Sequence, residues 1–162
     1  MTEIICYTGG TCGDMIAALI DPLDIVFCNG AVLHVSERTR LKKPHTFAND
    51  DEKDQYLAEV DYLAIPSHDL NYHVTRNHSF ISTIVTDMKT ALWAATRFKQ
   101  LHRPHVWEEM SRVCGAGTVK DYAQMLIDYS NMVQHLTNRT ISVKDIRDGL
   151  AVEKLQIGRA HV

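Results

Sequence analysis

The sequence Thr8-Gly9-Gly10-Thr11-Cys12-Gly13 stands between two short apolar runs, residues 2–7 and residues 15–20. The first run is rich in β-branched residues and predicts a buried strand, whereas the second predicts a helix that starts near Gly13-Asp14. A strand, a glycine-rich loop and a helix in this order favour phosphate binding, because backbone N–H groups and the helix N-terminus point at the anion. A tight strand-to-helix turn without a ligand explains the same residues, and both interpretations stay open.

The residues after the glycines limit the chemistry of this glycine-rich loop. No Lys stands there, so the loop is not a Walker loop, and a nucleotide kinase-like enzyme is a less favoured function. Cys12 lies at the predicted start of a helix, which predicts a lowered thiol pKa and a minor role as a nucleophile. No Arg stands at the spacing that a cysteine phosphatase loop needs.

Strand and helix patterns alternate along the rest of the chain. Asn29-Gly30, between two apolar runs, predicts a hairpin over residues 24–35, with a strand and an unpaired loop as the alternative. The alternation predicts one α/β domain, residues 1–155, in three layers with a mostly parallel central sheet. The other predicted strands are residues 62–65, 80–85 and 141–143, and the predicted helices are residues 50–60, a helix from Met88 onward, one opened by Pro104, residues 118–138 and residues 144–150.

Helical spacing also predicts which side chains face the core. In the helix after Met88, the apolar positions recur every three or four residues, with Arg97 and Lys99 off that face. The inward residues predicted for this helix are Ala91, Leu92, Ala95, Phe98 and Leu101, and those for residues 118–138 are Tyr122, Met125, Leu126, Tyr129, Val133 and Leu136.

Three loops are expected at the carboxyl edge of the parallel sheet, where ligands bind in this architecture. They are the glycine-rich loop, a loop over residues 66–79, and Thr86-Asp87. In the second loop His68 directly follows a strand, and a histidine there can take a proton from a hydroxyl near neutral pH. The alternative is a loop histidine bonded to the backbone. A metal site of His68, His73 and His78 with Asp69 is not expected, because a spacing of five matches neither a helix face nor a strand face.

Taken together, these residues resemble the P-loop sulfotransferase family over roughly residues 2–100. Residues 7–12 resemble the family's loop for the 5′-phosphate of the sulfonate donor, phosphoadenosine phosphosulfate (PAPS). Ile65-Pro66-Ser67-His68 resembles the strand that ends in the catalytic histidine, and residues 84–91 resemble the turn and helix that bind the 3′-phosphate. The resemblance implies sulfonate transfer from PAPS to a hydroxyl or amine, with His68 as base and Thr86 and Asp87 lining the donor site. Compact proteins similar to this family occur in viruses of microbes.

The chain differs from the family at the positions where the family has its phosphate-binding cations. Thr8 or Gly9 stands where the donor loop has Lys or Arg, Thr86 replaces the 3′-phosphate Arg, and Ala94 replaces a Ser. The basic residues from Arg38 to Lys43 are candidates to supply the missing charge. With His45 and Arg76 they are also candidates to close over an anionic ligand, and a solvated charged loop is the alternative. The alternative is a non-catalytic module on the same fold that binds a phosphate, a nucleotide or, through residues 104–136, a partner protein.

Composition limits which kinds of partner, and which cellular compartment, we expect for this protein. A formal net charge of −3 over 162 residues argues against bulk attraction to nucleic acid or to an anionic membrane. Four scattered cysteines indicate free thiols, and no secretion signal or membrane span is visible, so we expect a cytoplasmic protein. Residues 157–162 match the translation of a common sequencing adapter. We therefore interpret them as non-native and expect the natural chain to continue past about Leu155.

Overall fold

The computed structural model describes residues 2–20, 25–28, 31–35, 47–101, 104–113 and 115–148. It confirms an α/β chain with a parallel sheet: four parallel strands follow the order β4-β1-β5-β6, and β2 and β3 form a separate pair. The elements of the first half are β1 (Glu3–Cys6), α1 (Gly13–Ile20), β2 (Ile25–Cys28), β3 (Ala31–Val35), α2 (Asp50–Glu59), β4 (Ala64–Ser67) and α3 (Leu70–Thr75). Those of the second half are β5 (Ile81–Ile84), α4 (Met88–Leu101), α5 (Pro104–Val113), α6 (Val119–Val133), β6 (Thr140–Ser142) and α7 (Val143–Arg147).

The chain divides into two compact units. Unit 1 contains the described residues of Met1–Tyr7 and Gly13–Ile81, and unit 2 contains those of Thr8–Cys12 and Ser82–Ala151. The glycine-rich loop therefore belongs to unit 2 up to Cys12, whereas Gly13 and His68 belong to unit 1.

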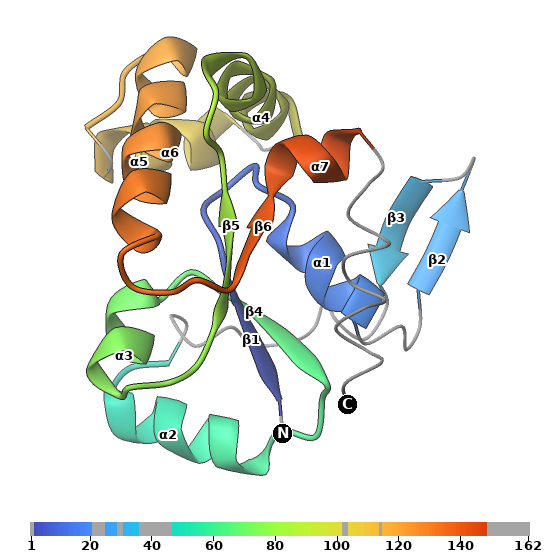
Figure 1. The fold of residues 1–162 in the computed structure, drawn as a ribbon, viewed down its shortest axis with the longest axis vertical. Helices are drawn as coiled ribbons and strands as arrows, with labels where there is room; N and C mark the ends of the chain where they lie inside the picture. The colour runs from blue at the N-terminus through green and yellow to red at the C-terminus, as the bar shows by residue number, and fades with distance from the viewer. Residues whose placement is uncertain are drawn as a thin grey trace. The chain divides into compact units, whose positions relative to one another are not determined.

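Unit 1 is built on the parallel pair β1 and β4, on which α1 packs (Figure 1). The register runs from Glu3 opposite Ala64 to Cys6 opposite Ser67. The backbone N–H groups of Glu3 and Tyr7 donate to the carbonyls of Leu63 and Ser67. Alternate residues of a strand bond to opposite sides, so Pro66 of β4 faces away from β1 and its missing N–H costs this pair no hydrogen bond.

The predicted hairpin and the predicted second helix of unit 1 are both present. β2 and β3 pair antiparallel, which rejects the unpaired alternative; Asn29-Gly30, the predicted turn, lies outside the described residues. The side chain of Asn49 accepts a hydrogen bond from the N–H of Glu52 and caps α2, where three acidic residues occupy the first turn. The helix predicted over residues 50–60 is therefore present as Asp50–Glu59.

Unit 2 is built around the parallel pair β5 and β6 and the helices α4, α5 and α6 (Figure 1). Its core holds an aromatic cluster in which the ring of Phe98 stacks on that of Tyr122, with centroids 5.3 Å apart, and Trp107 packs against both. The Oγ of Ser130 accepts a hydrogen bond of 2.8 Å from the N–H of Val85, so α6 is tied to the end of β5. These contacts hold α4 and α6 against each other, and the candidate site residues Thr86 and Asp87 directly precede α4.

Several predicted elements differ from the structure. The predicted loop over residues 66–79 is wrong, because β4 extends to Ser67 and α3 covers Leu70–Thr75. The last long helix ends at Val133 rather than near Asn138. The inward prediction is wrong for Leu92, Leu101 and Leu136, which are 37%, 67% and 46% exposed.

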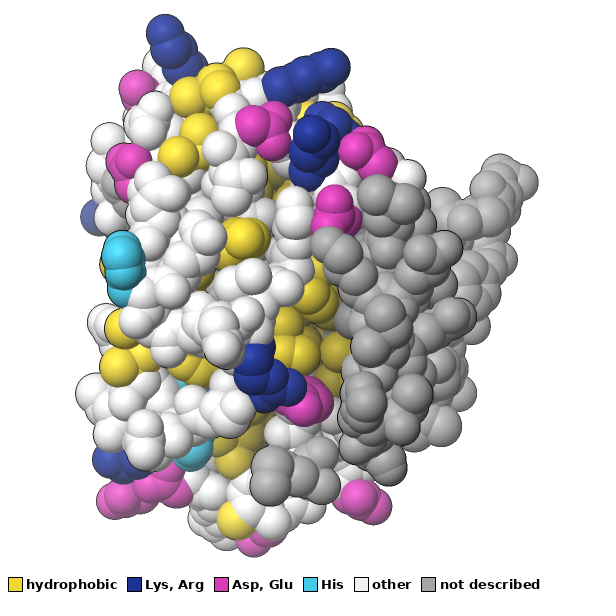
Figure 2. Space-filling model, in the orientation of Figure 1, with side chains coloured by type: hydrophobic (Ala, Val, Ile, Leu, Met, Phe, Trp, Pro, Cys, Tyr) yellow, Lys and Arg dark blue, Asp and Glu magenta, His cyan; other side chains and the backbone are white. Residues whose placement is uncertain are grey.

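The described surface mixes the two signs of charge. On the face shown in Figure 2, Lys and Arg side chains lie among Asp and Glu side chains and do not gather into one basic area. Within the described residues, every helix is too short or too polar to cross a bilayer.

Candidate functional site

The glycine-rich loop begins with a tight turn. The N–H and the Oγ1 of Thr11 both donate to the carbonyl of Thr8, at 3.1 Å and 2.6 Å, which closes a four-residue turn. Gly10 occupies its third position with φ +91°, a left-handed conformation that favours glycine. Thr11 is buried and its Oγ1 also bonds to the Oγ1 of Thr83 at 2.8 Å, so the loop is anchored to β5 inside unit 2.

The glycines of the loop lie against helices and rings. A Cβ on Gly9 would come within 2.5 Å of the Phe98 ring, and one on Gly10 within 2.6 Å of the Ala94 carbonyl oxygen. In unit 1, a Cβ on Gly13 would meet the ring of Tyr7 at 2.1 Å. The hydroxyl of Tyr122 donates to the carbonyl of Gly9 at 2.8 Å. Close packing is therefore a sufficient reason for each glycine, whether or not the loop holds a ligand.

A cation lies beside the last residue of the loop that belongs to unit 2. Nη1 of Arg97, on α4, donates to Sγ of Cys12 at 2.9 Å, and the guanidinium lies over the ring of Trp93, 5.5 Å from its centroid. Cys12 itself has φ +64°. Burial raises the pKa of the Cys12 thiol, and the charge and hydrogen bond of Arg97 lower it by less. The predicted low pKa of Cys12 is therefore wrong, because burial outweighs the effect of the cation.

His68 is exposed and lies against the end of β1. Its Nδ1 lies 2.9 Å from the carbonyl oxygen of Tyr7, and the two rings are 4.1 Å apart. A carbonyl only accepts hydrogen bonds, so Nδ1 carries the proton and the lone pair of the neutral ring is on Nε2. This is the backbone-bonded histidine of the alternative interpretation, and it is also the tautomer that a general base needs.

The other two histidines of this region belong to a buried chain of hydrogen bonds in unit 1. Nε2 of His73 lies 2.7 Å from Oγ of Ser67, and its Nδ1 lies 3.1 Å from Nδ1 of His78. His73 is fully buried, and burial first, then the charge of His78, lowers its pKa to about 4. His68 bonds elsewhere, and the described part of the chain contains no group of three His, Cys, Asp or Glu residues placed to hold a metal ion.

Ion pairs connect α2 to the segment that follows His68. Nζ of Lys53, largely buried, lies 2.5 Å from Oδ2 of Asp69. Arg76, a predicted candidate to close over an anion, instead pairs with Asp54 at 3.1 Å and reaches Asp50 at 4.0 Å. Its charge is therefore shared with carboxylates of α2, and its role as an anion ligand stays a prediction. The other basic candidates, from Arg38 to Lys43 and His45, lie outside the described residues.

Thr86 and Asp87 start α4. Thr86 is exposed, while Oδ2 of Asp87 accepts from both the N–H and the Oγ1 of Thr90, each at 2.9 Å, as an N-cap does. Burial raises the pKa of Asp87, but the two bonds from Thr90, with Lys144 and Arg147 of α7, bring it below the ordinary value. Oδ1 of Asp87 is buried and has no hydrogen-bond partner among the described residues.

Each unit thus gathers part of the predicted site. Unit 2 holds Thr8 to Cys12 with Thr86 and Asp87, and adds cations that the sequence patterns did not single out: Arg97 at Cys12, and Lys144 and Arg147 near Asp87. Unit 1 holds Gly13 and His68. Convergence of all three loops at one edge remains a prediction from the sequence.

No protein-family model, curated protein or solved structure matches the chain. Its own residues and their geometry therefore carry the functional proposal.

Proposed function

We propose that the chain binds a PAPS-type donor and transfers its sulfonate group to a hydroxyl or amine acceptor. In this proposal Thr8 to Gly13 form a P-loop-like start that holds the donor's 5′-phosphate, assisted by Arg97. His68 takes the proton of the acceptor while the acceptor atom bonds to sulfur and the bond from sulfur to the bridging oxygen of the donor breaks. Adenosine 3′,5′-bisphosphate then leaves.

The observation that carries the proposal is the charge of Arg97 beside the loop. A guanidinium has five N–H donors, whereas its described contacts are a thiol, which accepts weakly, and the face of Trp93. No described carboxylate forms an ion pair with it, so its charge is available to an anion. An arginine binds phosphate or sulfonate oxygens through two parallel hydrogen bonds, and Cys12 already directs one edge of the guanidinium toward the loop.

The tautomer of His68 supports the second role. With Nδ1 bonded to the Tyr7 carbonyl, Nε2 is the basic atom of the neutral ring and Nδ1–H is held in place when the ring becomes charged. His68 is exposed, so an acceptor can approach from solvent.

Near the start of α4, the side chains that suit the 3′-phosphate of the donor are the cations Lys144 and Arg147 rather than Asp87. Asp87 is an anion at neutral pH and already caps the helix, so it repels phosphate. Lys144 and Arg147 are close enough to Asp87 to act on its pKa, and they supply the sign of charge that Thr86 lacks. Oδ1 of Asp87 suits a donor group such as a ribose hydroxyl.

Donor binding is tested by thermal unfolding with adenosine 3′,5′-bisphosphate. Bound ligand stabilises the folded state, so we expect Tm to rise by at least about 1 °C at roughly millimolar ligand. Arg97→Met should abolish the rise, whereas Arg112→Met, the same change at a 76% exposed side chain of unit 2, should keep it. No rise in the unchanged protein would reject the nucleotide site and favour the interpretation of the loop as a turn in a non-catalytic module.

The role of His68 is tested by transfer of labelled sulfonate from PAPS to a panel of small phenols, alcohols and amines. We expect His68→Gln to lower turnover by about 10²-fold or more, because the general base is lost, while the Tm rise with adenosine 3′,5′-bisphosphate persists. His135→Gln, an exposed histidine of unit 2, serves as the matched control. Unchanged turnover in His68→Gln would remove His68 from the mechanism without touching donor binding.

A further inference from the structure

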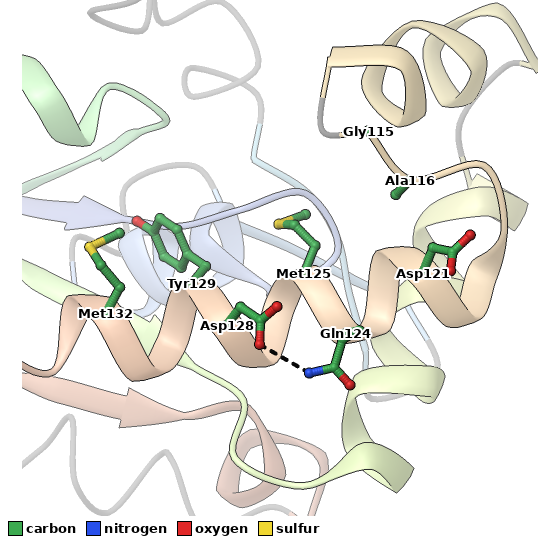
Figure 3. A pocket seen from close by; sticks show the side chains of 8 residues that line it. All are labelled: Gly115, Ala116, Asp121, Gln124, Met125, Asp128, Tyr129 and Met132. Carbon is green, nitrogen blue, oxygen red and sulfur yellow. Dashed lines mark hydrogen bonds between the residues drawn. The ribbon is translucent and has the colours of Figure 1, made fainter.

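An open hollow of about 580 Å³ lies along α6 in unit 2, and none of the described residues that line it belongs to the proposed donor site. Figure 3 shows that most of its lining comes from α6 itself and that the loop before α6 closes one end. We call it the α6 groove, and it is lined by Gly115, Ala116, Asp121, Gln124, Met125, Asp128, Tyr129 and Met132.

The floor of the α6 groove is apolar and follows a second seam of the helix. Met125, Tyr129 and Met132 recur at i, i+4 and i+7, and Figure 3 shows them rising from the same side of α6. Met132 is 44% exposed, and Leu136, four residues further, is 46% exposed. The core of unit 2 is formed mainly by a neighbouring seam, in which Tyr122, Leu126 and Val133 are buried, and Met125 is partly buried against that core. Methionine side chains adapt their shape to a partner, which suits a surface that receives another chain.

The rim of the α6 groove is acidic. Among the described residues, its lining contains the carboxylates of Asp121 and Asp128 and no Lys, Arg or His. Nε2 of Gln124 donates to Oδ1 of Asp128 at 3.0 Å, which orients that carboxylate along the side of the helix. An apolar floor with a negative rim is complementary to an apolar stripe flanked by positive charges.

We propose that the α6 groove binds a cationic amphipathic helix of a partner protein. α6 has 15 residues and is therefore roughly 22 Å long, which matches a bound helix of about three to four turns. Apolar side chains of that helix lie on Met125, Tyr129 and Met132, and its Lys or Arg residues face Asp121 and Asp128. A second copy of this chain docked through the same groove would bring two acidic rims together, so the charge favours a different partner.

The probe for this proposal is a synthetic 14-residue helical peptide with Leu at i, i+3, i+4 and i+7 spacing and Lys at the flanking positions, labelled with fluorescein. A matched peptide carries Glu in place of every Lys. With the full chain in fluorescence anisotropy, we expect the Lys peptide to bind with a Kd of roughly 100 µM or tighter, and the Glu peptide at least about tenfold more weakly. Equal binding of the two peptides, or no binding of either, would overturn the proposal.

Two neighbouring substitutions locate the binding surface. Met132→Lys and Asn131→Lys add the same charge at adjacent exposed positions of α6, but only Met132 lines the groove. We expect Met132→Lys to weaken binding of the Lys peptide about tenfold and Asn131→Lys less than about twofold. Equal losses would place the peptide elsewhere and overturn the proposal. Sedimentation of the free chain completes the test, because a dimer that Met132→Lys dissociates would assign the groove to a second copy and overturn it as well.

Discussion

Single contacts explain why the loop after β1 contains three glycines. Gly9 faces the ring of Phe98, Gly10 faces the backbone of Ala94, and Gly13 faces the ring of Tyr7. Rings can shift, whereas a helix backbone cannot move without breaking its own hydrogen bonds. Gly10 also has a positive φ, so it is the position at which a side chain costs most.

Gly10→Ala should destabilise the protein by roughly 2–4 kcal/mol, because the new Cβ meets a carbonyl oxygen and the backbone is left-handed. Gly117→Ala is the matched control, since a Cβ there meets nothing within 4 Å. We expect it to change the free energy of unfolding by less than about 0.5 kcal/mol. Chemical denaturation measures both values, and similar effects of the two substitutions would show that close packing does not explain Gly10.

At the scale of residues, the sequence predicts a side chain's chemical role only where that role follows from its place beside a strand or on a helix. His68 is found because it follows a strand, and its contact with the Tyr7 carbonyl fits that place. Arg97 is separated from Cys12 by 85 positions and appears in the sequence only as a charged residue off the apolar face of a helix. The thiol pKa of Cys12 depends on burial, which no local pattern reports.

Among the elements, α3 depends on one buried histidine. This helix has six residues, and its buried side chains are Tyr72 and His73. His73 connects α3 to the end of β4 through Ser67 and to the following segment through His78. The groups that act on its charge are His78, Asp69 and Lys53. Protonation of His73 would place a positive charge among buried groups without enough compensation.

Low pH should therefore lower the free energy of unfolding, because it favours protonation of His73 in α3. The pKa of His73 falls from 6.5 to about 4 on folding, so the unfolded chain binds the proton first as the pH drops. The contribution of neutral, buried His73 to the free energy of unfolding is complete above about pH 6.5. Between about pH 6.5 and 4 the free energy of unfolding falls by roughly 3 kcal/mol. Denaturant unfolding at pH 7 and pH 4 measures the loss. His73→Gln removes the titrating group but keeps hydrogen-bonding atoms, so it should lose roughly 3 kcal/mol less over this range.

The control for this measurement is His135→Gln, because His135 is exposed. It should follow the unchanged protein within about 0.5 kcal/mol at both pH values. If His73→Gln lost as much stability as the unchanged protein, the acid sensitivity would come from other groups.

Elements with long, regular patterns could be predicted from the sequence, and short ones could not. The caps Asn49 and Thr118 mark the starts of α2 and α6, and Pro104 marks that of α5. α3 has too few residues for a helical period to show, and its polar composition resembles a loop. Leu92 and Leu136 look inward by spacing, but partners distant in sequence decide which of two seams is buried.

For the whole molecule, the sequence predicts the class of sheet but not its order. Strands that alternate with helices imply parallel pairing, as the structure confirms, whereas the order β4-β1-β5-β6 depends on pairings between distant segments. The interactions of the candidate site also join residues that lie far apart in the sequence. The cations near Asp87 come from α7, more than 50 positions later, and the bond from Tyr122 to Gly9 spans 113 positions.

Pro66 also spares the sheet a buried, unpaired donor. β4 is the last strand on its side of the four-stranded sheet, and the nitrogen of Pro66 faces away from β1. All four residues of β4 are buried, so an N–H at this position would be a buried polar group that β1 cannot satisfy. Proline has no N–H, so the strand can end the sheet here without the cost of an unpaired backbone donor.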